Sequence, residues 1–312
     1  MNRIIWVVLF VCFNSNSLSS NDIKLSGYEL LHQAETHFLK SALDSSLKYL
    51  GLAESHFQST GQDSLIAVIG NQRARIYLLK EQGDSAMHFL KLNLAFIQNK
   101  FELQNELLAV CNDLMGEYYM SILDADAAMK YYQRSLNIRK YLYPHDHPRI
   151  AFSYSNYAKY YSFKIERDSA LFYAELAYKL YLKKPEVSNH IPYERIYMEY
   201  AYAYKIIHMH KGFDKTKTLK ETRVLYSNAL KFIDKKYGIN SLASAAVYRN
   251  MGNTYTDIIL GFEGKPDLKS YYFKKGITFY DKSIAICSNY IIGNNSTLST
   301  LYYVKALLYG YA

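Results

Sequence analysis

Histidine and cysteine are the residues of this chain that could bind a metal ion or act in covalent catalysis. His145 and His147 flank one residue in a turn bounded by prolines, whereas His208 and His210, two apart on an expected helix, point away from each other. We interpret both as chance pairs of surface histidines and not as metal sites. Neither a glycine-rich phosphate loop nor a Gly-x-Ser-x-Gly nucleophile turn occurs. The sequence therefore predicts a protein that is not an enzyme, with no catalytic residue, no metal and no cofactor.

The cysteines do not indicate a disulfide framework. Outside the first twenty residues only Cys111 and Cys287 occur, and they fall in different repeats, about four units apart in the array described below, which is too far to bridge. We predict two buried structural thiols. Stability must then come from helix packing alone.

A pattern that occurs twice between Leu107 and Leu182 predicts the elements that position the polar side chains. A large residue, a small residue and an aromatic residue are followed by small and aromatic residues at spacings of four and three: Met115-Gly116-x-x-Tyr119 with Ala128-x-x-x-Tyr132-x-x-Ser135, then Tyr157-Ala158-x-x-Tyr161 with Ala170-x-x-x-Ala174-x-x-Ala177. Residues three and four apart share one face of a helix. Each copy therefore predicts two amphipathic helices that approach closely at the small residues.

The same register extends along the whole chain. The small residue of each first helix is Ala34, Ala74, Gly116, Ala158, Ala201, Gly252 and Ala306. The central position of each second helix is Leu50, Leu90, Tyr132, Ala174, Tyr226 and Tyr280. The sequence thus predicts six helical hairpins and the first helix of a seventh. The turns inside the hairpins contain Asp44-Ser45, Gly83-Asp84-Ser85, Asp124-Ala125-Asp126 and Asp168-Ser169, which we expect to cap the exposed amides of the second helices and to complement the helix dipole.

This order of large, small and aromatic residues resembles the tetratricopeptide repeat (TPR). The long repeat, with Ser155-Asn156-Tyr157-Ala158 and Arg249-Asn250-Met251-Gly252, is similar to the repeats of kinesin light chains and to bacterial arrays that precede CHAT domains, which are caspase-like peptidases. The turns also resemble those of arrays in front of sensor histidine kinases. The resemblance covers roughly residues 27 to 312 and implies an all-α, right-handed superhelical solenoid of antiparallel helix hairpins. Neither Cys111 nor Cys287 matches a CHAT peptidase nucleophile.

The resemblance also implies a binding groove. In TPR arrays the first helices line the concave face, and the groove positions lie three and two places before the small residue and one after it. On this chain they predict a peptide-binding set of Asn71, Gln72, Arg75, Asn156, Lys159, Arg249, Asn250 and Asn253, with Asp113, Glu117, Ser155, Met198, Glu199 and Tyr202 at equivalent places. Asn156 and Asn250 occupy the position of the peptide-gripping asparagines of kinesin light chains. The simpler alternative is that solvent-facing helix positions tend to be polar.

Two late repeats carry insertions. Residues 212–220 and 261–269 share glycine, phenylalanine, an acid, leucine and lysine in the same order. Because adjacent repeats stack in parallel, we expect the two loops to lie side by side. They are either an extra docking edge or duplicated loop sequence without a function.

Residues 1–20 have the layout of a secretory signal peptide. Arg3 is followed by an apolar block, Ile4–Phe13, and by a polar run that ends in Ser17-x-Ser19. The alternative is an unprocessed hydrophobic cap on the first helix. We predict an exported protein, periplasmic or extracellular or facing outward from a membrane attachment, with the repeat array at 21–312. The formal charge of +9 comes with no nucleic-acid-binding motif.

The predicted function is a protein–protein interaction scaffold that binds a peptide or partner protein in the groove. The alternative is an N-terminal regulatory segment of a larger enzyme, either a CHAT-type peptidase or a sensor histidine kinase. The last expected helix, Leu298–Tyr311, is apolar on most of its circumference, and its partner helix does not occur before Ala312. We therefore expect the array to continue and this helix to support self-association.

Overall fold

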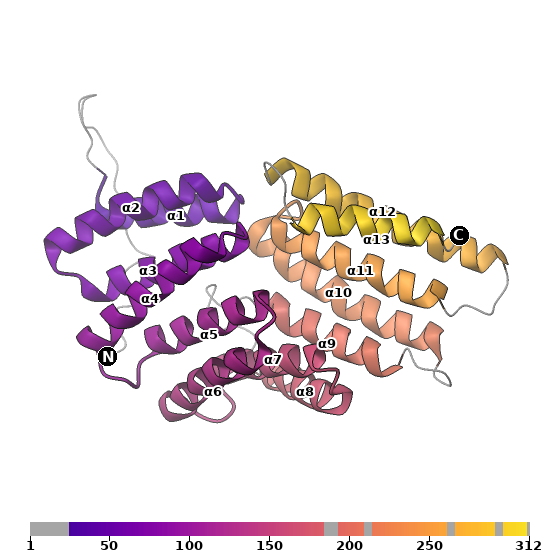
Figure 1. The fold of residues 1–312 in the computed structure, drawn as a ribbon, viewed down its shortest axis with the longest axis horizontal. Coiled ribbons are helices and arrows are strands. Elements are labelled where there is room, and N and C mark those ends of the chain that lie inside the picture. Colours follow the sequence, from indigo (N-terminus) through magenta and orange to yellow (C-terminus); the bar gives the residue numbers. More distant parts are fainter. Residues whose placement is uncertain (1–24, 184–192, 209–213, 261–265, 291–295, 311–312) are drawn as a thin grey trace.

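The computed structural model describes residues 25–183, 193–208, 214–260, 266–290 and 296–310. In these residues the chain forms thirteen α-helices and no strand, which confirms the all-α fold class (Figure 1). The helices are α1 Gly27–Leu39, α2 Leu43–Thr60, α3 Asp63–Leu79, α4 Gly83–Lys100, α5 Glu106–Ser121, α6 Ala125–Leu142, α7 Pro148–Phe163, α8 Arg167–Lys183, α9 Glu194–His208, α10 Lys215–Tyr237, α11 Leu242–Leu260, α12 Pro266–Tyr290 and α13 Ser296–Gly310.

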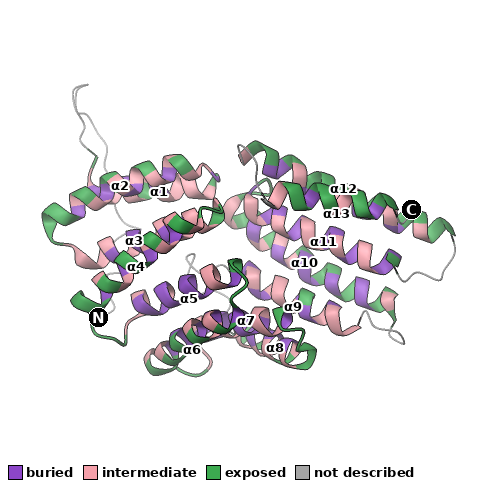
Figure 2. Cartoon of the chain, in the orientation of Figure 1, coloured by how far each residue is buried: buried purple, intermediate pink, exposed green. Residues whose placement is uncertain are grey.

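The helices pair in the predicted register. Each odd-numbered helix from α1 to α11 packs against the even-numbered helix that follows it, and α13 packs on α12 and α11. The predicted small residues of the first six hairpins and the central residues of their second helices are all buried. Buried and exposed residues alternate along the helices as narrow stripes (Figure 2). The core is therefore a continuous series of contacts between neighbouring hairpins.

The small residues are required by direct contact with a tyrosine ring. A Cβ atom added at Gly116 would lie 2.3 Å from Cε1 of Tyr132, and one added at Gly252 would lie 2.6 Å from Cε1 of Tyr280. Both rings are fully buried. The backbone of the first helix therefore forms the surface on which the ring of the second helix packs.

The turns inside the hairpins differ from the prediction. Asp124 does cap α6, because its Oδ1 accepts a hydrogen bond of 3.0 Å from the Ala127 amide. α2 and α4 begin without a side-chain cap, and Asp44 and Asp84 lie inside the first turn, so the capping role expected for them was wrong. Their place in the first turn suits the other role expected for them, because an acidic side chain there complements the helix dipole.

Backbone geometry closes these turns. In the first four hairpins, the second residue after the first helix adopts a left-handed conformation, with φ between 57° and 65°, at Ser41, Glu81, Leu123 and Ile165. The next amide then donates back to the predicted aromatic position, for example from Asp124 to the Tyr119 carbonyl oxygen at 2.9 Å. This is the Schellman arrangement, which satisfies the carbonyl groups at the helix end without any side chain.

The last helix is shifted from its expected register. Ala306 is exposed, whereas Leu301 and Leu308 are buried. Gly276 of α12 explains the difference, because a Cβ atom there would lie 2.8 Å from Cδ2 of Leu308. A leucine of α13 thus fills the space above a glycine of α12, and the small residue turns to solvent.

The insertions also differ from the prediction where the structure describes them. Residues 215–220 and 266–269 form the first turns of α10 and α12, which are 23 and 25 residues long. Asp214 caps α10 by accepting from the Thr216 and Lys217 amides at 2.8 and 3.1 Å. Residues 1–20, 209–213 and 261–265 lie outside the described residues, so the signal peptide and the duplicated glycine and phenylalanine positions stay predictions.

The hairpins follow an arc whose ends come together (Figure 1). The Ser41 hydroxyl, in the first turn, accepts a hydrogen bond from the Leu242 amide of α11 at 3.4 Å, and the Thr297 hydroxyl of α13 donates to Glu81. The turns of the first two hairpins therefore contact α11 and α13, so the array closes on itself. No described helix is both long and apolar enough to cross a membrane.

Candidate functional site

The concave face is lined by the first helices, and most of the predicted groove residues lie on it. Six of the eight have half-buried side chains: Gln72, Arg75, Lys159, Arg249, Asn250 and Asn253. The other two, Asn71 and Asn156, are buried. The prediction that all eight are available to a peptide was therefore wrong for these two asparagines.

Asn71 joins two repeats. Its Nδ2 donates to the Leu107 carbonyl oxygen of α5 at 3.1 Å, and its Oδ1 accepts from Nδ2 of Asn93 at 2.9 Å. Asn93 also donates to the Ala67 carbonyl oxygen at 3.0 Å. The amide of Asn71 is satisfied by the chain itself.

Asn156 joins three first helices. Its Nδ2 donates to Oδ1 of Asp113 on α5 at 2.9 Å, and its Oδ1 accepts from Arg195 of α9 at 3.0 Å. Asp113 and Ser155, at equivalent predicted positions, are buried as well. Side chains of the neighbouring helices cover these positions, since α7 packs against both α5 and α9.

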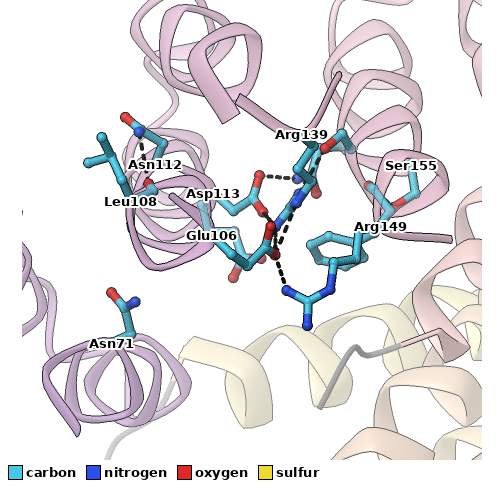
Figure 3. Close-up of polar contacts among 12 residues, drawn as sticks. Asn71, Glu106, Leu108, Asn112, Asp113, Arg139, Arg149 and Ser155 are labelled. Atoms are coloured by element: carbon cyan, nitrogen blue, oxygen red, sulfur yellow. Dashed lines mark hydrogen bonds and ion pairs between the residues drawn. The ribbon is translucent and has the colours of Figure 1, made fainter. Parts of the chain in front are cut away.

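A buried ion-pair network continues from Asp113 (Figure 3). Arg139 of α6 lies 2.7 Å from Oδ2 of Asp113 and 3.2 Å from Oε1 of Glu106, and its Nη1 donates to the Ser153 hydroxyl at 2.8 Å. Arg149 of α7 lies 2.6 Å from the same Glu106 oxygen. Neighbouring carboxylates raise the pKa of Arg139 although burial opposes the charge. The network fixes the positions of α5, α6 and α7 beneath the groove.

Arg195 brings this network to the concave surface. It forms an ion pair with Glu117 of α5, and the Arg195 charge holds the pKa of the Glu117 carboxyl below its usual value despite burial. Arg195 was not among the predicted residues. It lies six places before Ala201, outside the three groove positions, and only the packing of α9 against α7 brings it there.

Besides Arg75 of α3, three charged groove side chains have no ion pair to any described residue: Lys159 of α7, Glu199 of α9 and Arg249 of α11. Burial lowers the pKa of Lys159, the charges of Arg195 and Arg249 lower it further, and the carboxylates of Glu117 and Glu199 partly oppose the shift. Burial likewise lowers the pKa of Arg249 and raises the pKa of Glu199. Consecutive first helices therefore present desolvated charges that the chain itself does not neutralise by contact.

A second charged group lies where the ends of the arc meet. Arg75 of α3 interacts with Tyr237 of α10, and burial lowers the pKa of Lys236 to about 8 although Glu194 opposes the shift. Glu194 is buried, and burial raises its pKa. The predicted residue Arg75 therefore also contributes to closing the arc.

The histidines and cysteines have structural surroundings. Nδ1 of His147 accepts from the Arg149 amide at 3.2 Å, and the ring of His147 stacks on Tyr143 at 4.2 Å. His208 stacks on Tyr204 at 4.0 Å. Cys111 and Cys287 are buried free thiols, as predicted. Among the described residues no group of histidine, cysteine and acidic side chains could hold a metal ion.

Stacked hairpins with a small residue at each close contact and a polar inner face define a solenoid of the TPR type, and comparison with solved structures shows this fold. The apo form of RapI is similar to 92% of this chain over 97% of its own length, with 14% sequence identity and a TM-score of 0.53. No protein-family model matches the sequence, and no curated protein matches it.

Other similar structures are repeat proteins as well. The TPR-like repeats of a putative kinesin light chain from Podosopora anserina share 14% identity over 69% of this chain and 94% of that one, with a TM-score of 0.44. A tetratricopeptide repeat protein from Parabacteroides merdae shares 13% identity over 91% and 98%, with a TM-score of 0.39. The resemblance to arrays that precede CHAT domains stays a prediction.

Proposed function

We propose that this protein is an interaction scaffold whose concave groove binds a peptide segment carrying acidic side chains. The observation that carries the proposal is the pair Lys159 and Arg249, two half-buried cations on neighbouring parts of the groove without an ion pair to any described residue. A desolvated charge without a partner is unfavourable, and a carboxylate bound between the cations would offset that cost.

The charge balance of the groove supports an anionic ligand. Four basic side chains, Arg75, Lys159, Arg195 and Arg249, surround two acidic ones, Glu117 and Glu199. The Glu117 carboxylate is already paired with Arg195. Burial raises the pKa of Glu199, which reduces its ability to neutralise the remaining cations.

Polar groups next to the cations suit an extended peptide backbone. Gln72 and Asn250 are half-buried on the same face, and neither side chain makes a hydrogen bond to a described residue. Their amides can donate to carbonyl oxygens and accept from backbone N–H groups. The proposed ligand is therefore an extended acidic segment, with Lys159 and Arg249 binding its carboxylates and the amides binding its backbone.

The experiment measures fluorescence anisotropy of fluorescein-labelled decapeptides of glutamate, lysine and glycine–serine with the full chain. We expect the glutamate peptide to bind, and Lys159→Met and Arg249→Met each to weaken binding about tenfold, the loss of one charge-assisted contact of about 1.4 kcal/mol. Lys130→Met, an exposed lysine on the outer helix α6, is the matched control. Equal affinity of all three peptides, or equal effects of the control and groove variants, would contradict the proposal.

Further parts of the proposal concern context. We infer export on the basis of residues 1–20, which mass spectrometry of the mature N-terminus tests. A groove of this kind would also serve the alternative, a regulatory segment of a CHAT-type peptidase or sensor histidine kinase. The coding sequence after Ala312 separates the two, because the alternative requires a peptidase or kinase domain there.

A further inference from the structure

A pocket lies at the edge of the concave face, apart from Lys159 and Arg249. It has a volume of about 570 Å³ and is formed at the C-terminal ends of α7, α9, α11 and α13. Its apolar wall includes Ile165, Tyr202, Ile206, Leu260 and Leu307. Four of these, all except Ile206, are exposed large hydrophobic residues. The volume lies within the range of ligand sites in proteins, about 300–1,000 Å³.

The polar groups of this pocket are largely satisfied by one another. Lys205 Nζ lies 2.6 Å from Oδ2 of Asp257, and the hydroxyl of Tyr280 donates to Oδ1 of Asn253 at 2.9 Å. The Tyr280 hydroxyl also lies 2.9 Å from that of Thr256. A ligand therefore need not supply partners for these groups, and the surface left for it is mainly hydrocarbon.

Ile165 is the most exposed residue of this apolar wall. It has φ of 62° and its side chain is 68% exposed. The left-handed conformation is unfavourable for a β-branched residue and is one that glycine adopts freely. Ser41, Glu81 and Leu123 have the same conformation in the equivalent turns, so it belongs to the turn, and what distinguishes Ile165 is that its exposed side chain lines the pocket. An exposed isoleucine at this turn is explained if a partner covers it.

The charged lining residues indicate what that partner carries. Lys205 and Asp257 neutralise each other, which leaves Arg167 as the net charge of the lining. Arg167 is exposed and has no ion pair to any described residue. A carboxylate next to the apolar groups of the partner would therefore complement the pocket.

We propose that this pocket is a second docking site, which binds a partner-protein segment with large aliphatic or aromatic side chains next to an acidic residue. The apolar side chains enter the wall formed by Ile165, Leu260 and Leu307, and the carboxylate pairs with Arg167. The pocket adjoins the acidic-peptide groove, since Asn253 and Tyr202 line it, but its charged residues differ from Lys159 and Arg249. The open, outward-facing apolar wall suits a protein surface, which covers exposed hydrophobic area as well as the cavity.

The first test uses 1-anilinonaphthalene-8-sulfonate, which combines an aromatic ring system with an anion, as a fluorescent probe of the folded full chain. We expect Leu260→Glu, Arg167→Glu and Ile165→Gly each to weaken probe binding at least fivefold. Leu123→Gly is the matched control, because Leu123 occupies the same turn position with φ of 65° and 71% exposure but does not line the pocket. Lys159→Met should also leave probe binding unchanged, which separates this site from the groove.

The second test identifies the class of partner. Random peptides displayed on phage are selected on the full chain and counter-selected on Leu260→Glu. We expect enriched peptides to combine large apolar residues with an adjacent aspartate or glutamate. The proposal is wrong if the Ile165 and Leu123 variants bind the probe alike, or if no such peptides are enriched. It is also wrong if the chain self-associates as its concentration is raised, measured by sedimentation, and loses probe binding over the same concentration range. A second copy of the chain would then be the occupant of the pocket.

Discussion

Replacing Gly116 with alanine adds a single methyl group where α5 packs directly on the Tyr132 ring of α6. The new Cβ atom would lie 2.3, 2.5 and 2.9 Å from Cε1, Cδ1 and Cζ of Tyr132. A Cβ atom does not approach another heavy atom this closely in a folded protein, so either the Tyr132 ring or the helix backbone must move. The ring of Tyr132 is fully buried in the core with Ala128 and Leu136, so it cannot swing into solvent.

Two opposing effects set the magnitude. Alanine is favoured over glycine inside a helix by about 0.5–1 kcal/mol. Inserting a methyl group into a packed core costs about 1–3 kcal/mol. Since the ring cannot relax easily, the second effect dominates, and we expect Gly116→Ala to lower the free energy of unfolding by about 1–2 kcal/mol. Gly252→Ala should behave similarly, because its added Cβ would lie 2.6 Å from the Tyr280 ring.

Urea unfolding followed by circular dichroism at 222 nm measures this change through the transition midpoint. Gly83→Ala is the control, because its added Cβ would lie 3.6 Å from Tyr118, an ordinary contact. In the background of Tyr132→Leu, which removes the ring, the alanine at position 116 should cost less than in the parent. A midpoint for Gly116→Ala equal to or above that of the parent would refute the packing argument.

Four further predictions follow from buried or exposed groups. Asn156→Ala should lower the free energy of unfolding by about 1–3 kcal/mol, because Asp113 and Arg195 lose a buried partner, while Asn250→Ala should change the urea midpoint little. Burial raises the pKa of the Cys111 thiol to about 12, so iodoacetamide at pH 8 should modify it only after unfolding, as mass spectrometry would show. Burial lowers the pKa of Lys236 from 10.5 to about 8, so between these pH values the folded state binds fewer protons than the unfolded state. The free energy of unfolding should therefore rise from pH 8 to 9.5, and Lys236→Met should remove that rise. Self-association through α13 stays a prediction from sequence, and Tyr303→Glu should reduce it in sedimentation velocity, because this side chain is exposed.

The sequence predicted the helices and their pairing well because both depend on local spacing. Apolar and small residues three and four apart must share a helix face, and the alternation of glycine or alanine with tyrosine sets which faces meet. Gly116 with Tyr132 and Gly252 with Tyr280 show the rule at opposite parts of the chain. The register failed at Ala306, because Leu308 of α13 occupies the space above Gly276 and leaves Ala306 exposed.

The sequence also predicted which helices line the groove, but not which of their polar residues reach it. Asn156 and Asn250 have the same repeat position, yet Asn156 is buried between α5 and α9 while Asn250 is half-buried on the concave face. The difference arises from contacts between repeats, because Asp113 and Arg195 bind the amide of Asn156, and the repeat spacing does not encode which distant side chains reach a groove position.

What the sequence by itself determined is therefore the content of each hairpin, since a helix face is set by residues a few places apart. The tertiary structure decided every contact between distant residues. Ser41 meets Leu242 across 201 positions, and Arg195 reaches Glu117 across 78. Small rotations between successive hairpins add up along the arc, and only their sum brings the ends together, buries Asn156 and gathers the basic side chains around Glu117 and Glu199.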